Sequence, residues 1–239
     1  MPGSLYIVST PIGNLKDMTL RAIETLKEVD FIACEDTRVT SVLLNHLGIK
    51  PVSTWKSSQG RKELISVNAV NEKARINSVL ERVKNGESCA LVSDAGTPGI
   101  SDPGVRLISQ AIKEGIPVIP IPGVTAAITA LSISGLPTDS FVFEGFLPQK
   151  KGRQKKIKEL SEEKRTIIIY ESTYRIEKLL KELNEYIPDR FIVVCRELTK
   201  KFEDVWRGFP GELLNSFSEK ISKGEFVVII SPKNWKMNA

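Results

Sequence analysis

The first half of the chain alternates between short apolar runs and segments with helical spacing, and this alternation constrains the fold more than any other feature. The apolar runs, which predict buried strands, lie at residues 4–10, 30–34, 89–94 and 116–123. The segments that predict helices lie at residues 19–29, 38–48, 71–86 and 105–115. Because strict alternation of strand and helix is typical of parallel sheets, the sequence predicts an α/β fold with a mostly parallel N-terminal sheet.

The second half is less regular. Strands are predicted at residues 140–146, 165–172, 190–198 and 224–232, and helices at residues 124–135, 150–164 and 174–187, with a turn and a helix over 202–217. This order favours a mixed sheet. We therefore predict two α/β domains, residues 1–121 and 122–239, with a ligand cleft between them. The polar stretch from Ser53 to Asn71 has no clear period and predicts a loop or a loose helix.

Composition limits the chemistry. The net charge of +5 favours an anionic partner, although many basic proteins bind none. Three widely spaced cysteines in or beside apolar runs indicate free thiols in a reducing, cytoplasmic compartment. We expect no metal site, because there is no CxxC motif and the single histidine, His46, lies at a predicted helix end. Residues 116–138 carry no charge, but prolines interrupt them, so they predict a strand, a turn and a helix, and no membrane span.

The stretch DAGTPGISDPG, residues 94–104, lies between a predicted strand and a predicted helix. Three glycines allow the backbone to approach a ligand closely, and two prolines fix its course. In an open α/β sheet, ligands bind at this kind of strand-to-helix loop. The same pattern also fits an ordinary tight connection.

Three more stretches follow predicted strands in the same way. They are TPIGNLKDMTLRA (10–22), CEDTR (34–38) and PGVTAA (122–127). Because the carboxyl ends of parallel strands share one edge of a sheet, we expect these loops to converge with residues 94–104 on one site. There is no GxxxxGK loop and no GxGxxG motif, which disfavours a nucleoside triphosphatase or a nicotinamide enzyme.

A wider set of motifs resembles one known family. TPIGNLKDMTLRA, EDTR, SDAGTPGISDPG, SGLPTDSFVFEGFLP and RELTK, in this order, are similar to the family of ribosomal RNA small-subunit methyltransferase I. The resemblance runs from Leu5 to Ile230. It implies the tetrapyrrole-methylase fold, S-adenosyl-L-methionine as cofactor in the cleft, a homodimer, and 2′-O-methylation of a cytidine of 16S rRNA in the 30S subunit.

The resemblance and the convergence of loops together predict the cofactor site. Its predicted residues are Pro11, Asp94, Gly96, Thr97, Pro98, Thr125, Ala126, Tyr170 and Leu198.

The sequence departs from the family pattern in three places. A stretch of the form Tyr-His-x-His-Asn-Glu is replaced by a longer segment, TWKSSQGRKELISVNAVNE, without histidine. The helix after Gly123 opens with GVTA where the family has Pro-Ser-Ala, so that Thr125 keeps a hydroxyl. Many members have a helical C-terminal extension, whereas this sequence ends at Ala239. We therefore assume neither a substrate or proton role for the histidine stretch nor RNA affinity from the extension.

Methyl transfer to a ribose hydroxyl needs in-line positioning and benefits from a group that removes the hydroxyl proton. By position, the candidates are Asp102, Asp36 and Glu35. Each carboxylate could instead cap a helix or brace a loop. Arg38 could anchor a phosphate or pair with Asp36 or Glu35.

The segment QKKGRQKK, residues 149–156, concentrates basic side chains and predicts contacts to RNA phosphates. These predicted contacts are Lys150, Lys151, Arg153, Lys155 and Lys156. The alternative is a solvated helix face. In YESTYR, the side chains of Tyr170, Glu171, Tyr174 and Arg175 could stack on a base or brace it, or pack a strand end on its helix.

Two other functions stay open on the sequence. A tetrapyrrole methyltransferase would typically begin with a glycine-rich GxGPGDP loop, which TPIGNLKD lacks. A non-catalytic RNA-binding or ribosome-assembly protein on a methylase scaffold is disfavoured by the intact 94–104 loop. The altered Ser53–Asn71 segment keeps that reading open.

Overall fold

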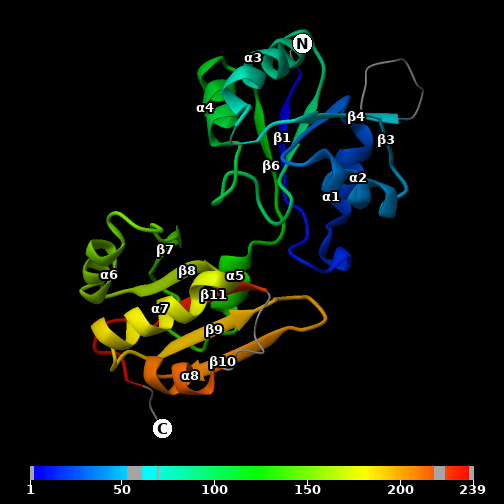
Figure 1. The fold of residues 1–239 in the computed structure, drawn as a ribbon. Helices are drawn as coiled ribbons and strands as arrows, with labels where there is room; N and C mark the ends of the chain where they lie inside the picture. Colours follow the sequence, from blue (N-terminus) through cyan, green and yellow to red (C-terminus); the bar gives the residue numbers. More distant parts are fainter. Residues whose placement is uncertain (1–2, 53–60, 69, 218–223, 237–239) are drawn as a thin grey trace. The chain divides into compact units, whose positions relative to one another are not determined.

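The computed structural model describes residues 3–52, 61–68, 70–217 and 224–236. Within the chain, two compact units divide between Thr125 and Ala126 (Figure 1). The sequence predicted a domain boundary slightly earlier, between residues 121 and 122.

The N-terminal unit contains a six-stranded sheet with the order β3-β4-β2-β5-β1-β6, in which every strand pairing is parallel. The strands are β1 (Leu5–Val8), β2 (Phe31–Cys34), β3 (Lys50–Val52), β4 (Arg61–Ser66), β5 (Cys89–Val92) and β6 (Val118–Ile121). The predicted parallel N-terminal sheet is confirmed. The strands β2 and β5 are buried along their whole length, as expected for parallel strands that helices cover on both faces.

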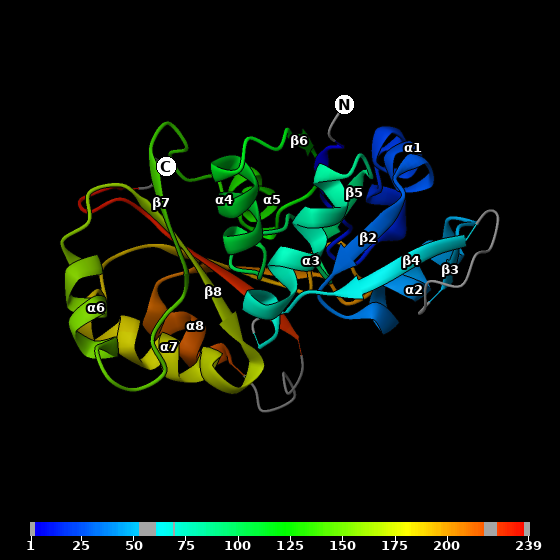
Figure 2. The same cartoon turned by 90° about the horizontal axis from the view of Figure 1, so that it is seen from above.

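Helices cover both faces of this sheet (Figures 1 and 2). They are η1 (Leu15–Asp17), α1 (Leu20–Glu28), α2 (Thr37–His46), α3 (Glu72–Lys84) and α4 (Val105–Lys113). In β2, Ile32 and Cys34 pack in the core on the side of α1 and α2, whereas Phe31 and Ala33 pack with α3 and α4. The alternation of side chains along each strand therefore supplies two separate apolar cores.

The C-terminal unit contains a five-stranded mixed sheet with the order β10-β9-β11-β8-β7. Its strands are β7 (Phe141–Phe146), β8 (Thr166–Ser172), β9 (Ile192–Arg196), β10 (Asp204–Gly208) and β11 (Glu225–Ile230). β7 and β8 are parallel, and the other pairings are antiparallel. The predicted mixed C-terminal sheet is also confirmed.

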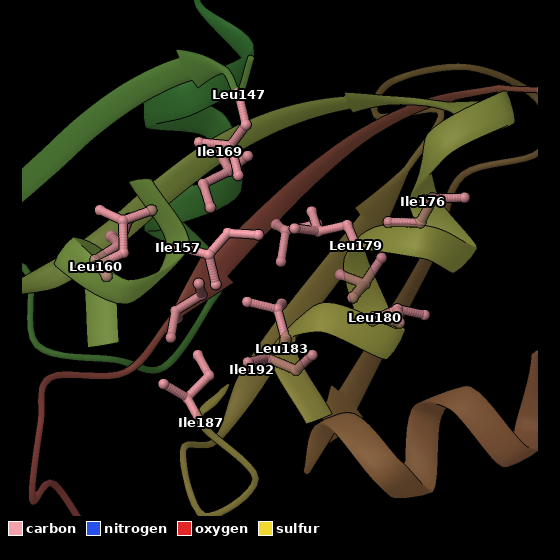
Figure 3. Close-up of a cluster of buried hydrophobic side chains, with 14 of the residues drawn as sticks. Leu147, Ile157, Leu160, Ile169, Ile176, Leu179, Leu180, Leu183, Ile187 and Ile192 are labelled. Atoms are coloured by element: carbon pink, nitrogen blue, oxygen red, sulfur yellow. The ribbon is translucent and has the colours of Figure 1, made fainter. Parts of the chain in front are cut away.

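The main core of the C-terminal unit lies between its sheet and three helices. The helices of this unit are α5 (Ala126–Ser132), α6 (Arg153–Ser161), α7 (Thr173–Tyr186) and α8 (Pro210–Ser216). Ile157 of α6 and Leu179 and Leu183 of α7 pack on Ile169 and Ile192 of the sheet (Figure 3). The strongly amphipathic pattern of residues 174–187 thus predicts the buried face of α7 correctly.

Two strands differ from the sequence expectation. β4 lies in the segment predicted to be a loop or loose helix. It pairs with β2 in a register that places Phe31 opposite Glu63 and Cys34 opposite Ser66. β10 lies where only a turn was predicted, and it pairs with β9 at the edge of its sheet. Both carry polar residues among the apolar ones, so neither shows a clean strand period. The predicted loop at residues 53–60 lies outside the described residues.

Within the described ranges, each helix is too short or too polar to traverse a lipid bilayer. The uncharged residues 116–138 form β6, a connection and α5, as their prolines predict.

A buried carboxylate joins the two helices on one face of the N-terminal sheet. Glu72, the first residue of α3, is 6% exposed. Its Oε1 accepts hydrogen bonds from the backbone N–H groups of Gly104, at 3.2 Å, and Leu107, at 3.4 Å. Gly104 precedes α4 and has no side chain to cap it. Glu72 therefore satisfies the open N–H groups of a helix from outside that helix.

We expect Glu72→Ala to destabilise the N-terminal unit by about 1–3 kcal/mol, because two backbone N–H groups lose their buried acceptor. Glu72→Gln keeps an acceptor oxygen and should lose less. Glu81→Ala, at an exposed position of α3, is the matched control. Urea unfolding measures all three, and a Glu72→Ala variant as stable as the Glu81→Ala variant would contradict the capping role.

Candidate functional site

The loops after β1 and β5 are joined by a reciprocal pair of backbone hydrogen bonds. The N–H of Thr10 donates to the carbonyl of Gly96 at 2.8 Å, and the N–H of Gly96 donates to the carbonyl of Thr10 at 3.0 Å. The hydroxyl of Thr10 also donates to the carbonyl of Ser93 at 3.1 Å. Thr10 is 2% exposed, so these bonds form inside the protein and fix the start of the 94–104 loop.

Further hydrogen bonds tie the neighbouring loops to this pair. The backbone N–H of Asp36, after β2, donates to Oδ1 of Asp94 at 3.1 Å. The hydroxyl of Thr97 donates to the carbonyl of Val124, after β6, at 3.1 Å and lies 2.8 Å from the hydroxyl of Ser9. The four loops predicted to converge therefore meet at the carboxyl edge of the N-terminal sheet.

The 94–104 loop has a backbone course that requires glycine. Gly96 has a φ of 86° and Gly104 a φ of 119°, in the region that side chains disfavour. A Cβ at Gly104 would lie 2.9 Å from Cδ2 of Leu91, so the loop also packs closely on β5. Ser101, which has a side chain, adopts a φ of 61°. Such local strain is concentrated at functional sites in proteins.

Three carboxylates of this edge influence one another. Burial raises the pKa of Glu35, and the charges of Asp94 and Asp102 raise it further. Burial also raises the pKa of Asp94, while the hydrogen bond from the backbone of Asp36 opposes the rise. A carboxyl group whose pKa is raised holds its proton at higher pH and is a better proton acceptor when ionised.

Asp36 has a different environment. Its Oδ1 accepts a hydrogen bond from the backbone N–H of Arg38 at 2.8 Å, which caps the start of α2. The guanidinium of Arg38 pairs with the same carboxylate at 2.5 Å. These hydrogen bonds lower the pKa of Asp36 to about 2. Arg38 itself is 89% exposed at its side chain. For Asp36, the structure favours a helix cap over a proton acceptor. For Arg38, it favours an ion pair over a phosphate anchor.

Sequence reasoning missed two hydroxyls of this edge, Ser9 and Ser66. Ser66 ends β4, and its hydroxyl donates to the carbonyl of Glu35 at 3.2 Å. Because β4 was not predicted, no pattern placed Ser66 beside the loop after β2. Ser9 follows β1 directly, and its position one residue before the TPIGN motif is the signal that could have identified it.

In the C-terminal unit, Tyr170 of β8 braces the start of α5. Its hydroxyl accepts a hydrogen bond from the backbone N–H of Ala127 at 3.0 Å. The predicted residues Tyr170 and Ala126 are thus brought close together, with Thr125 next in the chain. Pro11 and Pro98, in the N-terminal unit, are both buried.

Leu198 lies in a strained turn of the C-terminal unit. Leu198 is 6% exposed, and its two neighbours, Glu197 and Thr199, have φ angles of 50° and 65°. Among the described residues, the buried hydroxyl of Thr199 has no hydrogen-bond partner. A buried hydroxyl without a partner marks a place that a ligand can satisfy.

The predicted basic segment separates into two groups. Lys150, Lys151 and Lys155 are exposed, and Lys156 is half-buried and pairs with Glu144 at 2.7 Å. Arg153 does not fit the prediction that it contacts RNA phosphates. Its side chain is 3% exposed and pairs with Glu182 at 2.8 Å and Glu171 at 3.4 Å. These partners lie far along the chain, so the local sequence could not reveal them.

Within the described ranges there is no group of three or more His, Cys, Asp or Glu side chains arranged to hold a metal ion.

Comparison with known proteins defines the class. The family described as Tetrapyrrole (Corrin/Porphyrin) Methylases matches residues 4–214. A cobalt precorrin-4 methyltransferase of cobalamin biosynthesis has a similar structure, with a TM-score of 0.68 and 20% identity over 95% of this chain and 94% of that one. The uroporphyrin-III C-methyl transferase of Thermus thermophilus, solved with S-adenyl homocysteine, has a TM-score of 0.64 and 18% identity over 96% and 97% of the two chains. The fold is that of the tetrapyrrole methylases.

Sequence relatives narrow the class further. The chain is 44% identical to the ribosomal RNA small subunit methyltransferase I of Thermotoga maritima, over 97% of this chain and 99% of that protein. It is 46% identical to the protein of the same name from Escherichia coli O157:H7, over 95% of this chain and 77% of that protein. The chain belongs to the family of ribosomal RNA small subunit methyltransferase I.

The environment of Glu35 predicts a change in stability with pH. Since folding raises its pKa, ionised Glu35 destabilises the folded protein. The cost appears above the ordinary pKa of glutamate, grows with pH up to the raised pKa and is constant above it. Glu35→Gln should therefore stabilise the protein at pH 7 and have little effect below the ordinary pKa of glutamate. Urea unfolding at several pH values measures this difference.

Glu24→Gln, at an exposed position of α1, is the control for the loss of one negative charge. A Glu35→Gln variant that is less stable than the parent at pH 7, or equal to Glu24→Gln at every pH, would contradict the raised pKa.

Proposed function

We propose that this protein transfers a methyl group from S-adenosyl-L-methionine to the ribose 2′-hydroxyl of a cytidine in 16S rRNA of the small ribosomal subunit. One observation carries the proposal: relatives at 44–47% identity over nearly the whole chain are named ribosomal RNA small subunit methyltransferase I. The converging loops of the N-terminal unit supply a place for the chemistry. From the family resemblance, we also propose a homodimer that works in the cytoplasm.

The residues of the 94–104 loop fit the proposed cofactor. Gly96 is buried and has no side chain at φ 86°, and the hydroxyl of Thr97 is held by Ser9 and Val124, so that the course of the loop is fixed. Pro11, Asp94, Gly96, Thr97 and Pro98 would hold the cofactor there. Thr125, Ala126, Tyr170 and Leu198 stay predictions from the resemblance, as does the cleft between domains. The cofactor supplies a methyl group already activated on a sulfonium.

The protein's own contribution would be positioning and proton removal. A ribose hydroxyl is a weak nucleophile until its proton is taken. Among the three predicted acids, Glu35 fits this role best, because its pKa is raised toward the working pH. Asp36 fits least, because Arg38 and the start of α2 already use its carboxylate and lower its pKa to about 2. Asp102 is the second candidate, since its charge acts on Glu35.

Binding of the RNA backbone is assigned to Lys150, Lys151, Lys155 and Lys156. The first three are exposed. Lys156 pairs with Glu144 at 2.7 Å, and Lys155 lies 3.9 Å from Glu159 of the same helix. Exposed lysines close together attract phosphates without reading sequence. Arg153 is left out, because it is buried, and Arg38 stays a weaker candidate, because its guanidinium pairs with Asp36.

The test is a single-turnover methylation assay with S-adenosyl-L-methionine and 30S subunits, with mass mapping of the product. Glu35→Gln should slow the chemical step by about a hundredfold to ten-thousandfold, the usual contribution of a general base. Asp36→Asn should slow it by less than about tenfold, and Asp102→Asn should fall between the two. Cofactor affinity of all three variants should stay near that of the parent.

Two results would overturn the proposal. Methylation of a base in place of the ribose would reject the reaction. A Glu35→Gln variant as fast as the parent at every pH would reject Glu35 as the base. Uroporphyrinogen serves as the control substrate and should receive no methyl group, whereas methylation of it alone would favour a tetrapyrrole methyltransferase. Absence of cofactor binding by the parent protein would favour a non-catalytic RNA-binding protein.

A further inference from the structure

Two large aromatic side chains are exposed at one edge of the C-terminal sheet. Phe146, the last residue of β7, is 52% exposed, and Tyr174, in the first turn of α7, is 95% exposed. β7 and β8 are parallel, and α7 begins directly after β8, so both aromatics lie at the carboxyl ends of these two strands. The proposed cofactor and phosphate contacts do not use either ring.

A buried ionic network fixes the backbone beneath this edge. The carboxylate of Glu171, on β8, is fully buried and pairs with Arg175 of α7 at 2.7 Å and with Arg153 of α6 at 3.4 Å. Arg175 donates to the carbonyl of Leu147 at 3.4 Å, and Arg153 donates to the carbonyl of Pro148 at 3.3 Å. The turn that follows Phe146 is thus held from two helices by one buried acid.

The same network orients Phe146. The guanidinium carbon of Arg175 lies 5.7 Å from the centre of the Phe146 ring, and the ring also meets Tyr170 edge to face, with 5.7 Å between the centroids. A buried ion pair adds little stability compared with apolar packing, because both charges lose their hydration. What this network does supply is a fixed position for one exposed ring and for the turn beside it.

That turn carries positive charge. Lys150 and Lys151 follow Phe146 by a few residues and are both exposed, and Arg153 donates its backbone N–H to the carbonyl of Lys150 at 3.3 Å. An exposed aromatic ring beside lysines is the combination with which proteins bind single-stranded nucleic acid. The bases stack on rings, and the cations meet phosphates.

We propose that an unpaired RNA base stacks on Phe146, with Tyr174 as a second stacking surface, while Lys150 and Lys151 contact the adjacent phosphates. The inference rests on the proposed function and adds to it a site for bases outside the loops of the N-terminal unit. A ring that stacks on a base requires that base to be unpaired, so the surface selects single-stranded RNA over duplex.

The test compares the affinity of the full chain for a fluorescent single-stranded RNA oligonucleotide, for the same strand in a duplex, and for 30S subunits. Phe146→Ala should weaken binding of the single strand by about tenfold, within the range measured for loss of one stacked base. Phe146→Tyr should restore it, whereas Phe146→Leu, which keeps an apolar side chain without a ring face, should not.

Phe202→Ala is the matched control. Phe202 is also an exposed aromatic of the C-terminal unit, at 66%, and Lys201 lies over its ring at 5.5 Å. Its removal should leave RNA affinity unchanged. Replacing both Lys150 and Lys151 with Gln should reduce the slope of log affinity against log salt by about 1.4, the value for two phosphate contacts on a single strand. Phe146→Ala should leave that slope unchanged.

Equal loss of affinity in Phe146→Ala and Phe202→Ala would overturn the inference, and so would full restoration by Phe146→Leu. Weaker binding of 30S subunits with unchanged binding of naked RNA would indicate a protein partner and also overturn it. If the parent protein methylates 30S subunits while Phe146→Ala binds RNA normally, only this inference fails. If the parent neither binds RNA nor transfers a methyl group, the proposed function fails with it.

Discussion

The reciprocal hydrogen bonds between Thr10 and Gly96 are the contact on which the N-terminal unit depends for its functional edge. They join the loops of two neighbouring strands of the sheet, β1 and β5. Asp94 then reaches the loop after β2, and Thr97 reaches the loop after β6. Four separate connections become one rigid surface, and rigidity of this kind is what in-line methyl transfer needs from a protein.

In the C-terminal unit, buried ion pairs fix the backbone of the turn after β7. Glu171 is buried and holds Arg153 and Arg175, which in turn hold the carbonyl groups of the turn after β7. Removing one partner would leave an unpaired buried charge, which is more destabilising than loss of the pair as a whole. In both units, some polar side chains that the sequence suggests as ligand contacts hold the backbone of a loop in place. Asp94 and Thr97 do so in the N-terminal unit, and Arg153 does so in the C-terminal unit.

The sequence predicted most of the fold because its strongest patterns are local. The apolar spacing of residues 174–187 and the strand–loop–helix order around residues 94–104 need no knowledge of distant partners. β4 was not predicted because it lies near the edge of the sheet and carries polar side chains, so it lacks the apolar run by which the other parallel strands were recognised. Arg153 was assigned to RNA because its neighbours are lysines, whereas its true partners, Glu171 and Glu182, come from later elements. Asp36 and Glu35 are adjacent and chemically similar, and only the three-dimensional environment separates their pKa values.

The central claim is that the loop joined to Thr10 through Gly96 binds S-adenosyl-L-methionine. Calorimetric titration of Gly96→Val with this cofactor tests the claim most directly, because a β-branched side chain at positive φ alters the backbone that the cofactor would contact. Gly115→Val is the matched control, since Gly115 also has a positive φ, 72°, but lies just beyond the far end of α4. We predict that binding is largely lost in the Gly96 variant and retained in the Gly115 variant, with circular dichroism unchanged in both. Equal affinity in the two variants and the parent would contradict the account.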